Sequence, residues 1–275
     1  MRVWMWMIAV CAGLWSGEVY AVEKVKTPWS FWFSGKWEKA RFEHRLLDEV
    51  LQAHVKGRSV DYRGLAHSSR QKLDEYLFRV SRTKASEIQG NKARFAYWIN
   101  VYNALTLRAV LDRLPSSLAQ QRAFSVLNVK GGFWKGYSYE VGGRYLTLDQ
   151  IEHQILRPKY IDPRLHFAIV CASKGCPELQ ARAFTAERLE GMLDKGVRRY
   201  LAHTRGFQLD RASKTVKISK LFEWFKGDFE KGGYKGVLDF IGRHLQKGHG
   251  KTFIEAHGAE VKIAYLPYSW ALNLR

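Results

Sequence analysis

The apolar positions of this chain recur at helical spacing over several long stretches and alternate over a few short ones. A repeat every three or four residues predicts amphipathic helices, because such residues share one face of a helix. The stretch 91–114 is apolar around much of its circumference, so we expect it to form the central helix, which Pro115 ends. Helices are predicted on this basis over residues 38–56, 69–81, 91–114, 147–157, 185–203, 221–229 and 234–246.

Short alternating runs predict two hairpins and a final strand. Gly142-Gly143 separates the runs 137–141 and 144–146 by the two residues of a tight turn. Thr147 and Gln150 follow at the spacing of a capping box, so a helix should start directly after this hairpin. A second hairpin is predicted over residues 207–209 and 216–218, and a last strand over residues 260–266.

The stretch 162–180 indicates a strand that is covered on both sides. Apolar residues occupy both alternating sets of positions between Leu165 and Cys171, which is typical of a strand inside a packed layer. A glycine turn follows, and Pro177 suits the first position of a helix. We therefore expect Cys176 to lie at the start of that helix.

No repeat, linker or low-complexity tract divides the chain. The pattern favours one α+β domain, with a mixed or antiparallel sheet packed by helices and a helical N-terminal layer. We expect a signal peptide over residues 1–21, a helical lead-in over residues 22–59 and the main domain over residues 60–275.

The first residues have the features of a secretory signal. Met1-Arg2 is positive, residues 3–15 are apolar, and Val19-Tyr20-Ala21 suits a signal peptidase. This predicts a periplasmic or secreted protein, with a lipoprotein modified at Cys11 or a retained N-terminal anchor as alternatives. No later stretch is long and apolar enough to cross a membrane.

The formal net charge is +19, which in many proteins indicates nucleic-acid binding. Export argues against nucleic acid as a partner. Anionic lipid head groups, surface polysaccharide or peptidoglycan carboxylates are then the available partners, and a merely basic soluble surface is the plainer interpretation.

Cys176 is the first candidate for chemistry. A thiol at a helix start faces free backbone N–H groups and the positive end of the helix dipole, and both favour the reactive thiolate. A disulfide between Cys171 and Cys176 is the alternative. The two cysteines match no zinc signature, so we expect no metal and no cofactor.

Glu152 and His153 are the nearest partners for that thiol. Helical projection from Leu148 places Glu152 inside the apolar arc, where a carboxylate needs a partner, and His153 at its edge. His153 could activate the cysteine and Glu152 could orient it or take a proton. His166 is the other histidine, but on a regular strand it would lie ~15 Å from Cys171. Each of these residues also has a purely structural interpretation.

Three asparagines have the same two interpretations. Asn100 and Asn103 lie one turn apart on the central helix, and Asn273 lies near the C-terminus. Buried amides need partners, so they either hold loops in place or donate to a ligand or an oxyanion. Asp228 also has two interpretations, a structural role and a role in binding or chemistry.

Five motifs in one order carry a family resemblance. The motifs are Arg94–Leu111, Leu146–Arg157, Asp162–Leu179, Ile218–Phe229 and Tyr265–Asn273. Together they resemble the family catalogued as domain of unknown function 547, over roughly residues 60–273. Ser269 stands where relatives often carry an aspartate, which puts any role of that position in doubt. The resemblance implies a domain and no reaction.

Two functions remain in competition. One is a cysteine-dependent hydrolase or acyl transferase that acts on a small amide or peptide, with Cys176 attacking a carbonyl and His153 moving the proton. The other is a non-enzymatic periplasmic binding module for an anionic envelope component.

Overall fold

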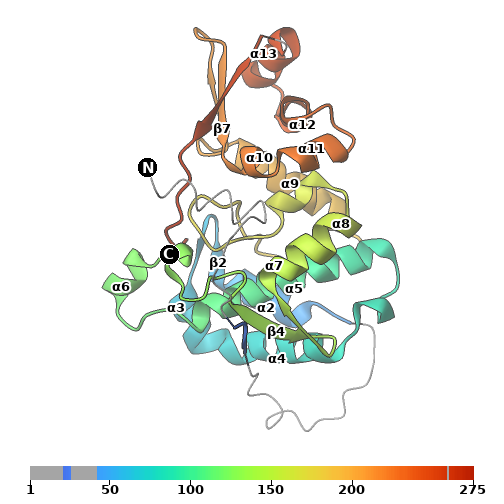
Figure 1. The fold of residues 1–275 in the computed structure, drawn as a ribbon, viewed down its shortest axis with the longest axis vertical. Helices are drawn as coiled ribbons and strands as arrows, with labels where there is room; N and C mark the ends of the chain where they lie inside the picture. The colour runs from blue at the N-terminus through green and yellow to red at the C-terminus, as the bar shows by residue number, and fades with distance from the viewer. Residues whose placement is uncertain (1–20, 26–41, 259) are drawn as a thin grey trace.

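The longest helix, α5 (Asn91–Leu111), runs through the middle of the larger part of the molecule, and the other elements pack around it (Figure 1). The computed structural model describes residues 21–25, 42–258 and 260–275. Every residue from Phe95 to Leu111 is buried, which confirms the prediction of a central helix. The helix ends three residues earlier than the predicted 114.

The N-terminal helices form a layer against α5. α2 (Arg45–His54) packs on α4 (Arg70–Arg82), and α4 packs on α5. Between them lie the short strands β2 (Val55–Lys56) and β3 (Ser59–Val60), followed by α3 (Tyr62–Gly64) and the π-helical turn η2 (Leu65–Ser69). The predicted signal segment 1–21 and the beginning of the predicted helix 38–56 fall almost entirely outside the described residues.

The first hairpin is confirmed. β4 (Tyr137–Val141) pairs antiparallel with β5 (Arg144–Thr147), and β1 (Glu23–Lys24) adds to β4 in parallel. Gly142 and Gly143 both have positive φ, as a two-residue turn of this type requires. The Thr147–Gln150 capping box is also present, and it starts one helical stretch made of α7 (Leu148–Gln150), η5 (Ile151–Leu156) and α8 (Arg157–Lys159).

β2 and β3 pair antiparallel as a separate two-stranded sheet, and the described C-terminal part contains another small sheet and five helices. β6 (Phe207–Asp210) pairs antiparallel with β7 (Thr215–Ser219), and β8 (Lys262–Leu266) joins β7 in parallel. The predicted helix 221–229 is two short helices, and α13 was not predicted. The helices are α9 (Leu189–Leu201), α10 (Leu221–Trp224), α11 (Lys226–Lys231), α12 (Val237–His244) and α13 (His249–His257).

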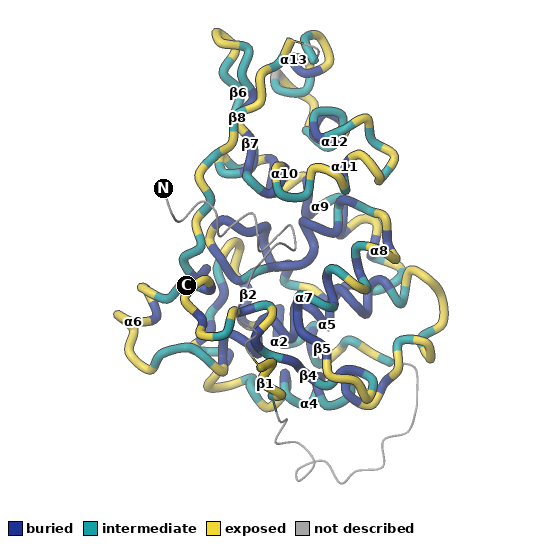
Figure 2. Tube along the Cα trace, viewed as in Figure 1, coloured by how far each residue is buried: buried dark blue, intermediate teal, exposed yellow. Residues whose placement is uncertain are grey.

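The predicted fold class is confirmed as one α+β domain, although its strands are divided among three small sheets rather than one. The buried residues form two clusters, visible as the dark segments of Figure 2. The larger surrounds α5, and the smaller is built from α9, β7 and α10 to α12. Phe167 is fully buried in the smaller cluster, although Leu165 and Ala168 on either side of it belong to the larger one.

The predicted strand over residues 165–171 is wrong. Residues 163–167 form a 3-10 helix, η6 (Pro163–Phe167), which Asp162 caps by accepting a hydrogen bond from the Arg164 N–H. No strand follows, because the side chain of Asn103 takes the backbone groups of Ala168 and Val170 that a neighbouring strand would have paired. The segment is buried without belonging to a sheet.

The predicted helix after Cys176 is also wrong. Residues 177–188 contain no helix, and the next one, α9, begins at Leu189, four residues after the start of the helix predicted over residues 185–203. Short helical segments that were not predicted also include η3 (Ala85–Glu87), α6 (Leu118–Ala123) and η4 (Val126–Asn128). Within the described ranges, no helix combines the length and apolar character needed to cross a membrane.

Candidate functional site

A narrow cavity of about 90 Å³ lies where the two buried clusters meet, and we call it the thiol cavity. The central helix contributes Tyr102, while Leu221 comes from the C-terminal part of the chain. Aromatic rings make up much of the wall. The residues of interest that line it are Glu152, His153, His166, Cys171 and Cys176, with Trp134, Trp224, Phe225, Tyr268 and Trp270. The fold therefore brings together five of the residues singled out in the sequence.

The two thiols of this cavity contact each other. Cys171 donates its backbone N–H to the sulfur of Cys176 at 3.0 Å, and the two side chains hydrogen bond as well. The Cys171 sulfur also lies 3.1 Å from the Ser173 hydroxyl and 3.3 Å from the Tyr268 hydroxyl. Both cysteines are free thiols.

These contacts give the two thiols opposite character. Burial raises the pKa of Cys176 well above the ordinary thiol value, and its hydrogen bond to Cys171 adds to the shift. Burial also opposes ionisation of Cys171, but hydrogen bonds from Cys176, Ser173 and Tyr268 outweigh it and lower its pKa to about 7. Activation of Cys176 by a helix start, as expected from the sequence, does not occur because no helix begins there.

The C-terminal segment holds the loop that carries both thiols. The N–H groups of Lys174 and Gly175 donate to the carbonyls of Ala271 and Ser269, both at 2.8 Å. Ala172, between the cysteines, has a φ of +58°, a conformation that costs a non-glycine residue energy. A Cβ on Gly175 would lie 2.8 Å from the Tyr268 ring, so only glycine fits there.

His166 is paired with a carboxylate. Its Nε2 lies 2.8 Å from Asp228 Oδ2, and its ring stacks on Phe225 with centroids 3.9 Å apart. Arg157 also binds Asp228, through Nε at 2.6 Å. Burial alone would raise the pKa of Asp228, but the bonds from His166 and Arg157 hold it well below its usual range.

The geometry around His166 leaves one ring nitrogen free. Asp228 accepts the Nε2 proton, so Nδ1 carries the lone pair of the neutral ring. Within the described part of the chain, Nδ1 makes no hydrogen bond, and the ring borders the thiol cavity. A histidine fixed by a carboxylate on one side and open on the other is the arrangement of a general base.

His153 and Glu152 are held differently. Arg157 donates to His153 Nδ1 at 2.7 Å, so the lone pair of that imidazole is already used, and His153 Nε2 lies 3.7 Å from Asp149. Glu152 is buried and accepts a hydrogen bond from the Tyr102 hydroxyl at 3.0 Å. The prediction from helical projection that Glu152 faces inward is confirmed.

The three asparagines are engaged with the protein itself and do not line the thiol cavity. Asn100 exchanges two hydrogen bonds with the backbone of Phe184, and Asn103 binds Ala168 and Val170. Asn273 accepts from the Tyr62 hydroxyl at 2.8 Å. Of the two interpretations, the contacts match the one in which these amides hold loops.

Residues 86–201 match the family described as "Protein of unknown function, DUF547". This part of the chain is a DUF547 domain. The resemblance inferred from the five sequence motifs is thereby confirmed for this range. Neither the curated proteins nor the solved structures contain a match to the chain.

The DUF547 domain supplies both cysteines, His166, Glu152 and His153, whereas Asp228 and Tyr268 lie beyond the matched range. The sequence analysis missed Tyr268 and the aromatic wall. The sequence did contain a sign of these residues, because Trp224 lies in the motif Ile218–Phe229, and Tyr268 and Trp270 lie in the motif Tyr265–Asn273. What was missing was a reason to place those motifs beside the cysteine loop.

Proposed function

We propose that this chain is a cysteine-dependent hydrolase or acyl transferase acting on a small amide or peptide, with Cys171 as nucleophile and His166 as acid and base. The observation that carries the proposal is that a thiol of lowered pKa and a carboxylate-bound histidine line one cavity. These are the two components that nucleophilic cysteine catalysis requires.

The proposed reaction has two steps. In the first, His166 takes the thiol proton of Cys171, the thiolate attacks the carbonyl carbon, and the C–N bond breaks as the His166 imidazolium gives that proton to the departing amine. In the second, water attacks the thioester, returns a proton to His166 and displaces the thiolate with release of the acid. In acyl transfer, an amine or alcohol takes the place of water.

Donors around the cavity suit the charge that develops on the substrate oxygen. The indole N–H of Trp270 is buried and has no hydrogen-bond partner among the described residues. Burial raises the pKa of Tyr268 far above its ordinary value, so its hydroxyl keeps the proton that it donates to the Cys171 sulfur before the attack. Fixed donors of this kind stabilise an oxyanion without reorganising.

The assignment differs from that expected from the sequence, which placed Cys176 and His153 in these roles. Cys176 is more deeply buried than Cys171 and has a raised pKa, and the lone pair of His153 is occupied by Arg157. In the proposal, Cys176 and Glu152 position the reacting groups: Cys176 through its bond to the Cys171 sulfur, and Glu152 through Tyr102.

Turnover of a panel of aminoacyl and dipeptidyl 4-nitroanilides by the reduced protein tests the proposal. Cys171→Ser should abolish turnover of any substrate that the wild type cleaves, and mass spectrometry should trap an acyl group on Cys171 and not on Cys176. Cys176→Ser is the matched control and should keep part of the activity. An acyl group on Cys176 would support the assignment made from the sequence and overturn this one.

We further propose that the protein is exported to the periplasm. The support is the positive, apolar and small-residue pattern of residues 1–21. Cell fractionation with N-terminal sequencing of the mature chain tests it, since the proposal expects a periplasmic protein that begins near Val22. A cytoplasmic protein that keeps Met1 would contradict it.

The alternative proposal is a non-enzymatic binding module for an anionic envelope component, and the formal charge of +19 is the observation that favours it. In that case the cysteines are structural. Slow alkylation of both thiols, or a Cys171–Cys176 disulfide in the protein isolated from cells, would favour this alternative over the enzyme.

A further inference from the structure

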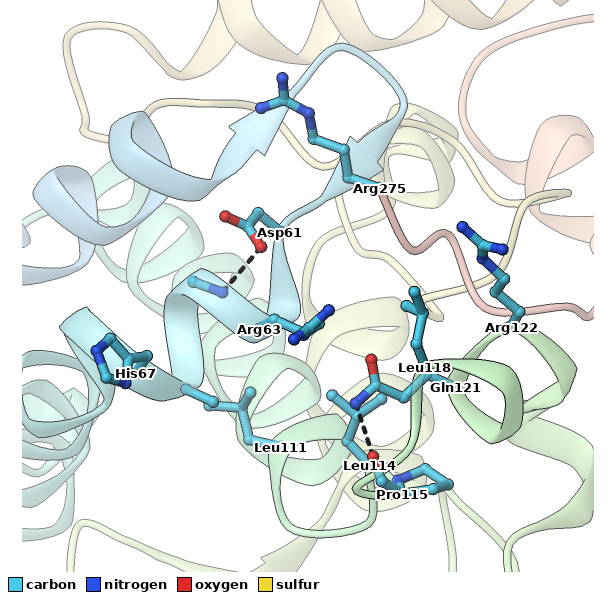
Figure 3. A pocket seen from close by; sticks show the side chains of 12 residues that line it. Asp61, Arg63, His67, Leu111, Leu114, Pro115, Leu118, Gln121, Arg122 and Arg275 are labelled. Atoms are coloured by element: carbon cyan, nitrogen blue, oxygen red, sulfur yellow. Dashed lines mark hydrogen bonds between the residues drawn. The ribbon is translucent and has the colours of Figure 1, made fainter.

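A second and larger pocket has a volume of about 880 Å³, and Figure 3 shows the side chains that line it. It is formed by α3 and η2, the end of α5, α6 and the C-terminal residue Arg275. It shares no lining residue with the thiol cavity. Its size is that of pockets that hold small organic ligands.

Three arginines border this pocket, and we call it the arginine pocket. Arg63, Arg122 and Arg275 are exposed, and none of them makes an ion pair or a side-chain hydrogen bond within the described residues. Other arginines of the chain are paired, such as Arg164, which binds three carboxylates. The three guanidinium groups therefore have their donors available for an anion.

One carboxylate also borders the pocket. Asp61 accepts a hydrogen bond from the Gly64 N–H at 2.8 Å, and its other oxygen lies 3.9 Å from His54. Its charge is therefore partly engaged by its own turn, whereas burial lowers the pKa of His54 and disfavours a charged partner there. Among the lining side chains, three guanidinium groups stand against one carboxylate.

The strongest sign of a ligand is Gln121. This residue is 4% exposed, and its Nε2 donates to the Pro115 carbonyl at 2.7 Å, which fixes the orientation of the amide. Its Oε1 is buried without a hydrogen-bond partner among the described residues. Figure 3 shows this oxygen pointing from α6 toward the middle of the pocket, on the side of Arg63. A buried acceptor of this kind costs free energy unless something donates to it.

An apolar floor completes the pocket. Leu111, Leu114 and Pro115 lie on one side and Leu118 on another, and Leu118 is 39% exposed. The ligand that suits these surroundings carries a negative group for the arginines, a hydroxyl for Gln121 and a carbon skeleton for the leucines.

We propose that the arginine pocket binds the phosphate ester of a small polyol, of which glycerol phosphate is the simplest case. The phosphate would take the guanidinium donors, because its oxygens accept paired N–H bonds and its charge matches several arginines. A polyol hydroxyl would donate to Gln121 Oε1. Such an ester exists as a free metabolite and as the head group of an anionic phospholipid, and the experiment distinguishes these two sources.

Isothermal titration of the full chain with glycerol 3-phosphate, inorganic phosphate and glycerol tests the proposal. Glycerol 3-phosphate should bind more tightly than inorganic phosphate, and glycerol should not bind measurably. Co-sedimentation with phosphatidylglycerol vesicles, against phosphatidylcholine vesicles, is the second arm. Binding in the first arm identifies a soluble ligand, binding in the second a lipid head group, and binding in neither overturns the proposal.

Two variants locate the site. The double variant Arg63→Gln, Arg122→Gln should weaken binding at least tenfold, while Arg144→Gln, which removes an exposed arginine from β5, should leave it unchanged. Gln121→Leu should remove the preference for glycerol 3-phosphate over inorganic phosphate. Equal loss with Arg144→Gln would show binding by general charge and contradict the proposal. Alkylation of Cys171 in each variant reports separately on the thiol cavity.

Discussion

At the scale of single residues, the chemistry of the thiol cavity depends on which thiol and which histidine face each other. The spacing of Cys171, Cys176 and His166 in the sequence does not reveal this, because the distance along a chain depends on its conformation. A strand would have carried His166 ~15 Å from Cys171. The 3-10 turn at Pro163–Phe167 has a shorter rise per residue, and His166 and Cys171 border one cavity.

The role of Asp228 leads to a first prediction. Asp228→Asn keeps the size of the side chain but removes the charge that fixes the Nε2–H tautomer of His166. We expect kcat/KM to fall by about a hundredfold, with most of the loss in kcat. Asp239→Asn is the control, since Asp239 also binds an arginine, Arg243, but lies outside the thiol cavity. A similar loss in both variants would point to stability rather than catalysis.

The contact between the two sulfurs leads to a second prediction. Oxidation with diamide, which takes up the two thiol hydrogens, should link Cys171 to Cys176 and abolish turnover, and dithiothreitol should restore it. Peptide mapping by mass spectrometry identifies the bridge. Two separately modified thiols with no bridge would show that the sulfurs do not approach as closely as the structure places them.

At the scale of elements, hairpins and long helices could be predicted because local signals fix them. The Gly142-Gly143 turn, the Thr147–Gln150 capping box and the apolar stripe of α5 each act over a few residues. The segment 165–171 has the composition of a buried strand, but its backbone groups bond to a side chain 65 residues or more away in the sequence. No local pattern encodes that contact.

Asn103 is therefore predicted to stabilise this element. Asn103→Ala leaves the carbonyl of Ala168 and the N–H of Val170 buried without partners, and each such group costs about 1–3 kcal/mol. Urea unfolding should show a loss in that range or above. The matched control is Asn128→Ala, at an exposed position of η4, which should change the unfolding free energy by less than about 0.5 kcal/mol. Equal effects would contradict this account of the segment.

At the scale of the whole molecule, the α+β class followed from the sequence, but the location of the site did not. The thiol cavity lies between a cluster around α5 and a cluster formed by later elements, so its walls combine residues that are distant in the sequence. The arginine pocket likewise combines α3, α6 and Arg275. The five motifs contain the lining of the thiol cavity except Trp134, but of the arginine pocket they contain only Leu111. Only the packing of the elements brings each set of residues together.

Global stability should depend on pH through His44. Burial lowers the pKa of His44 to about 4, and its ring bonds to the Tyr76 hydroxyl at 2.9 Å. The folded state disfavours the charged ring, so stability is lost as the pH falls from about 6.5 toward 4. Urea unfolding at several pH values should show this loss in the wild type relative to His44→Gln. Parallel pH curves for the two proteins would contradict the prediction.

The central claim is that Cys171 is an ionised, reactive thiol, and the rate of its alkylation by iodoacetamide as a function of pH tests this most directly. Mass spectrometry should place the modification on Cys171, with a half-maximal rate near pH 7, and Cys171→Ser should abolish the reaction. A half-maximal rate near the ordinary thiol pKa of about 8.5, or modification of Cys176 alone, would contradict it.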